Sequence, residues 1–200
     1  IEIANSSKEP IKLEQFSNTK KYLEQFKIKL TNRKSLKRTK KKWYEMIEPR
    51  QFYRFNQHKI ITPNLSKRNN FTVDFGDNSQ KRHYFIDHDC YGIILNDKTK
   101  ENYLFILSIL NSKLIDFFIK QISPEYGGKY YKYHSQYLEN IPIIQNNSKI
   151  TKQCIELVKK IIHGKNIEKS TEIDEDKLDE LVYKLYGITD EEKAIIESSI

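Results

Sequence analysis

The sequence is short of cysteine and glycine, and it contains no long uninterrupted apolar run. Its two cysteines, Cys90 and Cys154, cannot build a disulfide framework, so they predict free thiols and a cytoplasmic protein. The most apolar stretch, residues 103–119, is interrupted by polar and charged residues, which argues against a membrane span and a membrane partner. No signal peptide is recognisable, and the only methionine is Met46, so we expect a piece of a longer polypeptide.

Catalytic signatures are also missing. Gly127 and Gly128 form an isolated pair, which predicts a turn rather than a phosphate-binding loop. The sequence has no serine nucleophile elbow, and the nuclease-like string Glu175-Asp176-Lys177 lies in an acidic helical segment without a partner strand. We therefore expect no catalytic residue in this chain, and a small independent nuclease is the least favoured function.

One cluster of possible metal ligands lies in a segment with strand character. Its members are His83, Asp87, His88, Asp89 and Cys90. Neighbouring side chains of a strand point to opposite faces of the sheet, so these five cannot all converge on one ion. The sequence therefore predicts no metal site.

Positive charge is unevenly placed along the chain. The formal net charge is +8. Residues 1–42 carry 13 Lys and Arg against 4 Asp and Glu, whereas residues 165–200 carry 5 against 11. A basic body with an acidic end is typical of proteins that bind polyanions. The alternative is an ordinary solvated surface in a lysine-rich protein.

Hydrophobic periodicity predicts an α+β fold, in which a small mixed or antiparallel sheet packs on a long central helix. Helical spacing predicts an N-terminal helix at residues 18–40 and the central helix at 101–122. Alternating segments predict strands within 58–95, at 58–62, 71–75, 84–86 and 91–95. Residues 149–200 are expected to form a helical tail that packs on a domain of residues 1–148.

Three sequence signals divide the tail into helices. Residues 152–163 repeat apolar positions at helical spacing, and Gly164 is expected to end that helix. Gly187 is expected to stop a second helix over residues 176–186. The run Thr189-Asp-Glu-Glu192 is a capping box, which predicts a last short helix.

The chemistry that remains is that of nucleic-acid binding. A basic and aromatic loop over residues 123–140 combines rings that stack on bases with lysines that neutralise phosphates. The candidates for phosphate contact or stacking are Lys40, Lys41, Lys42, Lys129, Tyr130, Lys132 and Tyr133. Other polar clusters carry side chains that hydrogen-bond to base edges, and these base-reading candidates are Arg50, Arg54, Arg68, Asn69, Arg82 and His83. The alternative is a tyrosine-rich loop whose rings pack on the central helix.

The order of several short motifs resembles that of a known family. The motifs are Trp43-Tyr-Glu45, Tyr91-Gly-Ile-Ile94, Leu110-Asn-Ser-Lys-Leu114, Tyr137-Leu-Glu-Asn-Ile-Pro-Ile143 and Leu178-Asp-Glu-Leu-Val-Tyr-Lys-Leu-Tyr-Gly187. In this order they resemble the TaqI-like C-terminal specificity domain. That domain is the target-recognition part of adenine-specific DNA methyltransferases and of fused restriction–modification enzymes. The resemblance covers nearly the whole chain.

The resemblance implies a division of labour with an upstream methyltransferase domain of the same bacterial polypeptide. In the family, that domain binds S-adenosylmethionine and methylates a flipped adenine through an Asn/Asp-Pro-Pro-Tyr/Phe motif, and some members also carry a nuclease. This chain lacks such a motif, so we expect it to bind no cofactor and to present double-stranded DNA to domains outside it. The alternative is a protein-interaction module. The expected scaffold residues are Trp43, Tyr44, Leu110, Leu114, Phe117, Ile141 and Pro142.

Overall fold

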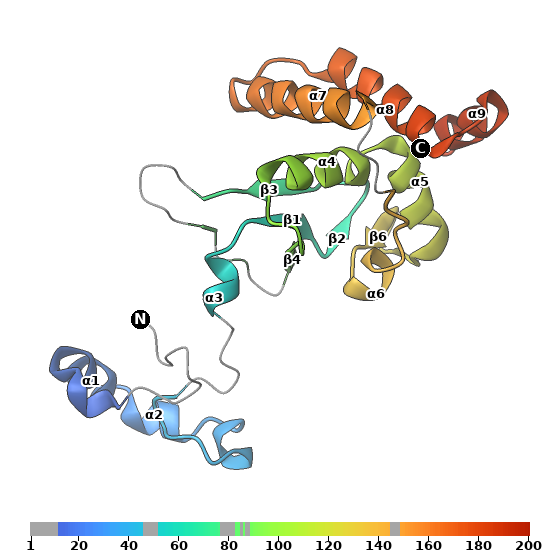
Figure 1. The fold of residues 1–200 in the computed structure, drawn as a ribbon. Helices are drawn as coiled ribbons and strands as arrows, with labels where there is room; N and C mark the ends of the chain where they lie inside the picture. The colour runs from blue at the N-terminus through green and yellow to red at the C-terminus, as the bar shows by residue number, and fades with distance from the viewer. Residues whose placement is uncertain (1–11, 46–51, 77–82, 85, 87–88, 145–148) are drawn as a thin grey trace. The chain divides into compact units, whose positions relative to one another are not determined.

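The computed structural model describes residues 12–45, 52–76, 83–84, 86, 89–144 and 149–200. The chain divides into two compact units, Ile1–Arg54 and Phe55–Ile200, and each unit is described here by itself. Helices and two small antiparallel sheets make up the fold, which confirms the predicted α+β class (Figure 1). Both cysteines are free thiols, as predicted.

The first unit consists of short helical segments. They are η1 (Leu13–Gln15), α1 (Ser17–Glu24), α2 (Lys27–Thr31) and η2 (Leu36–Arg38), and the short helix α3 (Phe52–Phe55) crosses the division between the units. The prediction of one continuous helix at residues 18–40 is therefore wrong. Phe26 leaves the helical conformation at φ −109° and ψ 8°. Beyond α2, the guanidinium of Arg33 donates hydrogen bonds to the carbonyls of Leu30, Trp43 and Glu45, which holds the chain folded back.

The first sheet has the strand order β3-β1-β4, and both of its pairings are antiparallel. Its strands are β1 (Lys59–Pro63), β3 (Thr72–Asp74) and β4 (Cys90–Ile93). They confirm three of the four predicted strands. The fourth, at 84–86, is wrong for its described residues, since Tyr84 and Ile86 lie outside any strand.

The second sheet has the order β2-β6-β5 and was expected as a loop. Its strands are β2 (Leu65–Ser66), β5 (Glu125–Tyr126) and β6 (Tyr130–Lys132), and α6 (Ser135–Leu138) follows them. Leu65 pairs with Lys132 and Ser66 with Tyr131, so a hairpin from the second half of the chain joins a strand from the first half. We call these three strands, with Lys67 and Arg68 directly after β2, the hairpin sheet.

The predicted central helix is divided into α4 (Lys100–Leu110) and α5 (Lys113–Ile122), with a bend of 64° between them. Asn111 ends α4, and the Ser112 hydroxyl begins α5 by accepting a hydrogen bond from the amide of Ile115 at 3.4 Å. A residue that caps a new helix cannot also continue the previous one, which is why the prediction of one helix is wrong. Among the described residues, no single helix is long and apolar enough to cross a membrane, and α4 and α5 pass that test only as a bent pair.

The tail consists of α7 (Lys149–Asn166), α8 (Glu172–Tyr186) and α9 (Asp190–Ser198). Gly187, at φ 68°, ends α8, and the capping box of Thr189 and Glu192 begins α9, both as predicted. The expectation that Gly164 ends its helix is wrong. This glycine is buried inside α7, where an added Cβ would lie 2.6 Å from the Thr171 methyl group. Because glycine has no side chain, the segment that leads from α7 to α8 can pack against the helix at this position.

The core of the second unit lies around α4, with the strands on one side and α7 and α8 on the other (Figure 1). Cys154, Val158 and Leu178 of the tail belong to the same buried cluster as Ile60 and Ile109.

The predicted scaffold residues Tyr44, Leu110 and Ile141 are buried, whereas Trp43, Leu114 and Phe117 are half-buried. Pro142 is exposed, so its scaffold assignment is wrong, although its carbonyl accepts a hydrogen bond from Tyr186.

Candidate nucleic-acid interface

The hairpin sheet brings together cations and rings that are distant in sequence. The Lys67 ammonium lies 5.2 Å from the ring centroid of Tyr130, and the Lys132 ammonium lies 5.4 Å from that of Tyr126. Each lysine therefore extends along a tyrosine face, an arrangement that holds a flexible side chain near one orientation through cation–π attraction. The pairing of β2 with β6 places these two cation–ring pairs in one sheet.

The hairpin turn carries a charge at a strained position. Gly127, Gly128 and Lys129 have φ angles of 57°, 88° and 65°, so three consecutive residues lie in the left-handed region. Glycine adopts this conformation freely, whereas lysine does not. The backbone N–H of Lys129 donates to a carboxylate oxygen of Glu125 at 2.9 Å, which stabilises the turn. The predicted turn at Gly127-Gly128 is confirmed.

Exposure makes this surface available to a partner. The Tyr126 and Tyr130 side chains are 58% and 40% exposed, and Lys129 is exposed between them. Ammonium groups neutralise phosphates, and tyrosine faces stack on unpaired bases or pack against sugars. Arg68, also exposed, follows β2 in the same sheet. Its guanidinium is suited to bidentate hydrogen bonding with a base edge.

Two of the predicted contact residues are engaged inside the fold. Tyr133 is fully buried, and its ring packs 5.7 Å from that of Phe71, so the prediction of an exposed stacking ring is wrong. Burial, together with the nearby carboxylate of Asp116, raises the pKa of Tyr133. The Asn69 side chain donates to the carbonyls of Leu110 and Ser112 and accepts from the Tyr133 hydroxyl. Its amide is thus already used within the protein.

His83 lies beside a buried ion pair rather than in the hairpin sheet. Its Nδ1 is 3.2 Å from Asp74, whose carboxylate also contacts the Lys59 ammonium at 2.5 Å. Burial by itself would raise the pKa of the Asp74 carboxyl. The hydrogen bond from Lys59 and those from the amides of Gly76 and Tyr84 outweigh burial and hold the pKa below its ordinary value.

The remaining candidates belong to the first unit or lie outside the described residues. Lys40, Lys42 and Arg54 are exposed, and Lys41 is half-buried. Lys42 lies 5.7 Å from the ring centroid of Tyr44. Arg50 and Arg82 fall outside the part of the chain that the structure describes, as do Asp87 and His88 of the cluster of possible metal ligands. Within the described ranges, no three His, Cys, Asp or Glu side chains form a group that could hold a metal ion.

A cavity of about 1050 Å³ adjoins the hairpin sheet, and sequence reasoning did not anticipate it. Arg68 and Asn70 line one side, and Lys165 and Glu175 line the other. Burial favours a raised pKa for Glu175, but hydrogen bonds from Lys165 and Thr171 and the charge of Arg68 lower the pKa below its ordinary value. The walls come from segments about a hundred residues apart, so no local pattern could have revealed them.

The family model for the TaqI-like C-terminal specificity domain matches residues 7–143, and the chain therefore belongs to this family. It is similar to the type II methyltransferase M.BanIII of Aneurinibacillus aneurinilyticus, with 26% identity over 188 residues, 92% of this chain and 31% of the relative. It is also similar to the type II methyltransferase M.BstVI of Geobacillus stearothermophilus, with 24% identity over 196 residues, 98% of this chain and 32% of the relative.

The chain thus spans about a third of the length of these curated relatives. The family match and the two relatives support a DNA-recognition domain of a restriction–modification enzyme, as the motif order indicated. The alternative of a protein-interaction module is not favoured.

Proposed function

We propose that the hairpin sheet is the surface with which this chain binds double-stranded DNA and reads a short target sequence. The observation that carries the proposal is the pair of cation–ring contacts, Lys67 with Tyr130 and Lys132 with Tyr126, in one sheet in which both tyrosines are exposed. Lys67, Lys129 and Lys132 contact phosphates, while the two tyrosines pack against sugars or bases. Arg68 reads a base edge, with guanine as its preferred partner.

The parent protein proposed here is a site-specific, adenine-specific DNA methyltransferase of the bacterial cytoplasm. The names of the two relatives, both type II methyltransferases, support the methyltransferase part of this proposal, as does the share of their length that the chain leaves uncovered. The adenine specificity follows from the family resemblance. S-adenosylmethionine binds to an upstream methyltransferase domain of the same polypeptide, which supplies the chemistry. Any endonuclease activity also resides outside this chain, whose own contribution is recognition.

The test is fluorescence anisotropy of a randomised duplex pool with the full 200-residue chain, across a salt series, followed by sequencing of the bound fraction. Three lysine–phosphate contacts predict that log K falls by about 2.7 per unit of log salt, or about 0.9 for each contact. Enrichment of a short motif is expected in addition. Absence of binding at low salt would overturn the proposal.

Two variants separate the roles within the sheet. Arg68→Ala is expected to relax sequence preference at one position of the enriched motif. It should also lower the affinity of the chain for that motif about 10- to 100-fold. Lys129→Ala is expected to weaken the binding of all DNA sequences to the same extent. Lys152→Ala, which removes an exposed lysine of α7 outside the sheet, is the matched control and should change neither quantity. Equal loss on selected and random duplexes after Arg68→Ala would remove Arg68 from base reading.

A further inference from the structure

The motif Asn111-Ser112-Lys113, where α4 ends and α5 begins, connects three parts of the second unit. Asn111 contacts the segment after β2, Ser112 caps α5, and Lys113 contacts the tail. We call these three residues the junction. The motif contributed to the family resemblance, but its physical role is visible only in the structure.

The first connection runs from the junction to the chain segment that follows β2. The Asn111 side chain accepts from the amide of Phe71 and donates to its carbonyl, both at 2.9 Å, as a neighbouring strand would. Asn69 makes the complementary contacts. Its side-chain nitrogen donates to the Leu110 carbonyl at 2.6 Å and to the Ser112 carbonyl at 3.2 Å. The Leu110 carbonyl lies at the end of α4, where the last carbonyls have no partner within the helix. The Ser112 carbonyl also accepts from the amide of Asp116 at 3.0 Å.

The second connection runs through Asn69 to the hairpin. The Tyr133 hydroxyl, directly after β6, donates to Asn69 Oδ1 at 3.1 Å. The backbone N–H of Asn69 donates to Asp116 Oδ1 at 2.8 Å, and Asp116 Oδ2 lies 2.7 Å from the Lys120 ammonium. Asn69 is therefore fixed through its backbone and through both ends of its side-chain amide. The backbone of its neighbour Arg68 is therefore held in place as well.

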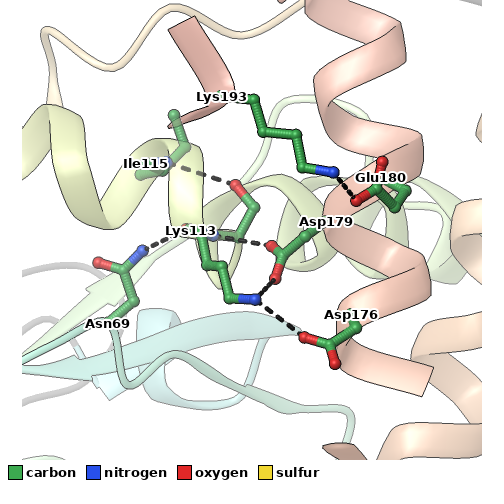
Figure 2. A network of polar contacts seen from close by, with 8 residues as sticks. Asn69, Lys113, Ile115, Asp176, Asp179, Glu180 and Lys193 are labelled. Atoms are coloured by element: carbon green, nitrogen blue, oxygen red, sulfur yellow. Dashed lines mark hydrogen bonds and ion pairs between the residues drawn. The ribbon is translucent and has the colours of Figure 1, made fainter. Parts of the chain in front are cut away.

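The third connection joins the junction to the tail. Figure 2 shows Lys113 reaching Asp176 and Asp179 of α8, with Asn69 approaching the junction from the side of the strands. The Lys113 ammonium lies 2.8 Å from Asp176 and 3.5 Å from Asp179, and its backbone N–H donates to Asp179 at 2.8 Å. The junction is thereby fixed from both sides.

We propose that Asn69 is a positioning residue for DNA reading. It holds Arg68 and the hairpin at a constant spacing through the junction and does not itself touch a base. This inference rests on the proposed function of the hairpin sheet. A bidentate contact with a base edge tolerates displacements of only about 0.5 Å, whereas a lysine on a flexible stem still reaches a phosphate. Loss of Asn69 should therefore weaken discrimination between sequences more than it weakens binding itself.

The experiment uses the full chain with Asn69→Ala, Tyr133→Phe and the double variant. Asn70→Ala, which changes the exposed neighbour in the same loop, is the matched control. Tyr133→Phe keeps the buried ring and removes the hydroxyl, so it remains informative if Asn69→Ala fails to fold. Two quantities are measured: amide hydrogen exchange at Lys132 and Tyr133 without DNA, and the affinity ratio between the selected and random duplexes.

Both single variants are expected to exchange these amides about tenfold faster, because each lost hydrogen bond removes part of the hairpin's protection. Asn69→Ala should reduce the affinity ratio about tenfold with an unchanged salt slope. The double variant should be no worse than Asn69→Ala, since the two changes remove one shared bond. Asn70→Ala should leave exchange and discrimination unchanged.

Unchanged exchange at Lys132 and Tyr133 in both single variants would overturn the positioning role, whatever the DNA result. Faster exchange with an unchanged affinity ratio would also overturn it, because the contacts would then be structural only. A wild-type chain that binds no DNA would instead refute the proposed function at its first step. The exchange measurement distinguishes these failures, since it needs no DNA.

Discussion

At the scale of single residues, the fold depends on charges that lie away from water. Lys59 is 2% exposed, and its ammonium contacts Asp74 and donates to the carbonyl of Phe55. Asp74 is fixed in turn by the amides of Gly76 and Tyr84. Such a pair is strongly destabilising when one member is removed, because the other charge stays buried without compensation.

Lys59→Met is expected to lower the free energy of unfolding by roughly 3–5 kcal/mol, since it leaves the Asp74 carboxylate buried without its cation. Urea denaturation at neutral pH measures this loss. The double variant Lys59→Met, Asp74→Leu replaces both charges with apolar groups and should recover most of the stability. A double variant no more stable than the single one would contradict this explanation.

Asp179 is expected to make stability depend on pH. Burial raises the pKa of Asp179 from 3.8 to about 6, against the opposing hydrogen bonds and charge of Lys113. A raised pKa means that the folded protein binds this proton more tightly than the unfolded chain does. The contribution is therefore fully present below pH 3.8 and is lost as the pH rises through about 6.

Relative to Asp179→Asn, the wild type should lose up to about 3 kcal/mol of unfolding free energy between pH 4 and pH 7. Urea denaturation of both proteins at each pH measures the difference. A difference that stays constant across this range would show that burial does not set the proton affinity of Asp179.

The nature of the candidate DNA-binding residues was predictable from sequence, but their individual environments were not. Lys129, Tyr130 and Lys132 stand out as a run of cations and rings, and the structure places Tyr130 and Lys132 in β6 of the hairpin sheet and Lys129 in the turn before it. Tyr133 belongs to the same run yet is fully buried. Its partner, Asn69, lies 64 residues earlier in the chain, and local composition carries no information about such a pairing.

At the scale of elements, the patterns that repeat over several residues were predicted best. The strands near residues 60, 73 and 92 and the tail helices showed clear alternation or helical spacing. The central helix was predicted as one because apolar residues continue on both sides of Asn111, so periodicity alone did not reveal the cap at Ser112. The strands of the hairpin sheet have only two or three residues, too few for any period to appear.

A substitution at Lys129 in the hairpin turn should change protein stability and DNA binding in opposite directions. Lys129→Gly should stabilise the protein by about 1 kcal/mol, because glycine removes the cost of a left-handed φ of 65°. The same change should weaken DNA binding and reduce the salt slope by about 0.9, the contribution of one phosphate contact. Thermal unfolding and anisotropy measure the two effects.

Glu168→Gly is the control, because Glu168 also has a left-handed φ, of 55°, but lies between α7 and α8. It should stabilise the chain to a similar extent and leave DNA binding unchanged. A loss of DNA binding in this control as large as that of Lys129→Gly would argue against a specific phosphate contact at the turn.

At the scale of the second unit, the tail is part of the core. The family model ends at residue 143, but α7 and α8 cover α4 with Cys154, Val158 and Leu178. Removing residues 149–200 should therefore expose the apolar side of α4 and abolish cooperative unfolding, which circular dichroism during thermal denaturation would detect. Each buried aliphatic side chain contributes about 1.5–3 kcal/mol.

Removing only Ser199 and Ile200, which are exposed, should leave the transition intact. Cooperative unfolding of a chain that ends at residue 148 would show that the tail is dispensable for the fold. The amphipathic pattern of the tail predicted its helices, but it did not predict their share of the core. A periodic pattern shows that a helix has an apolar face without showing what covers it.

The turn of the hairpin has a consequence for how this protein family can diversify. Of the described part of the chain, nothing lies within 4 Å of a Cβ added at Gly127 or Gly128. The tip therefore has room for added residues, although positions 127 and 128 themselves favour glycine because their φ angles are 57° and 88°. On the proposed function, variation at the tip would change the general affinity for DNA, whereas a new target sequence would need a change at Arg68.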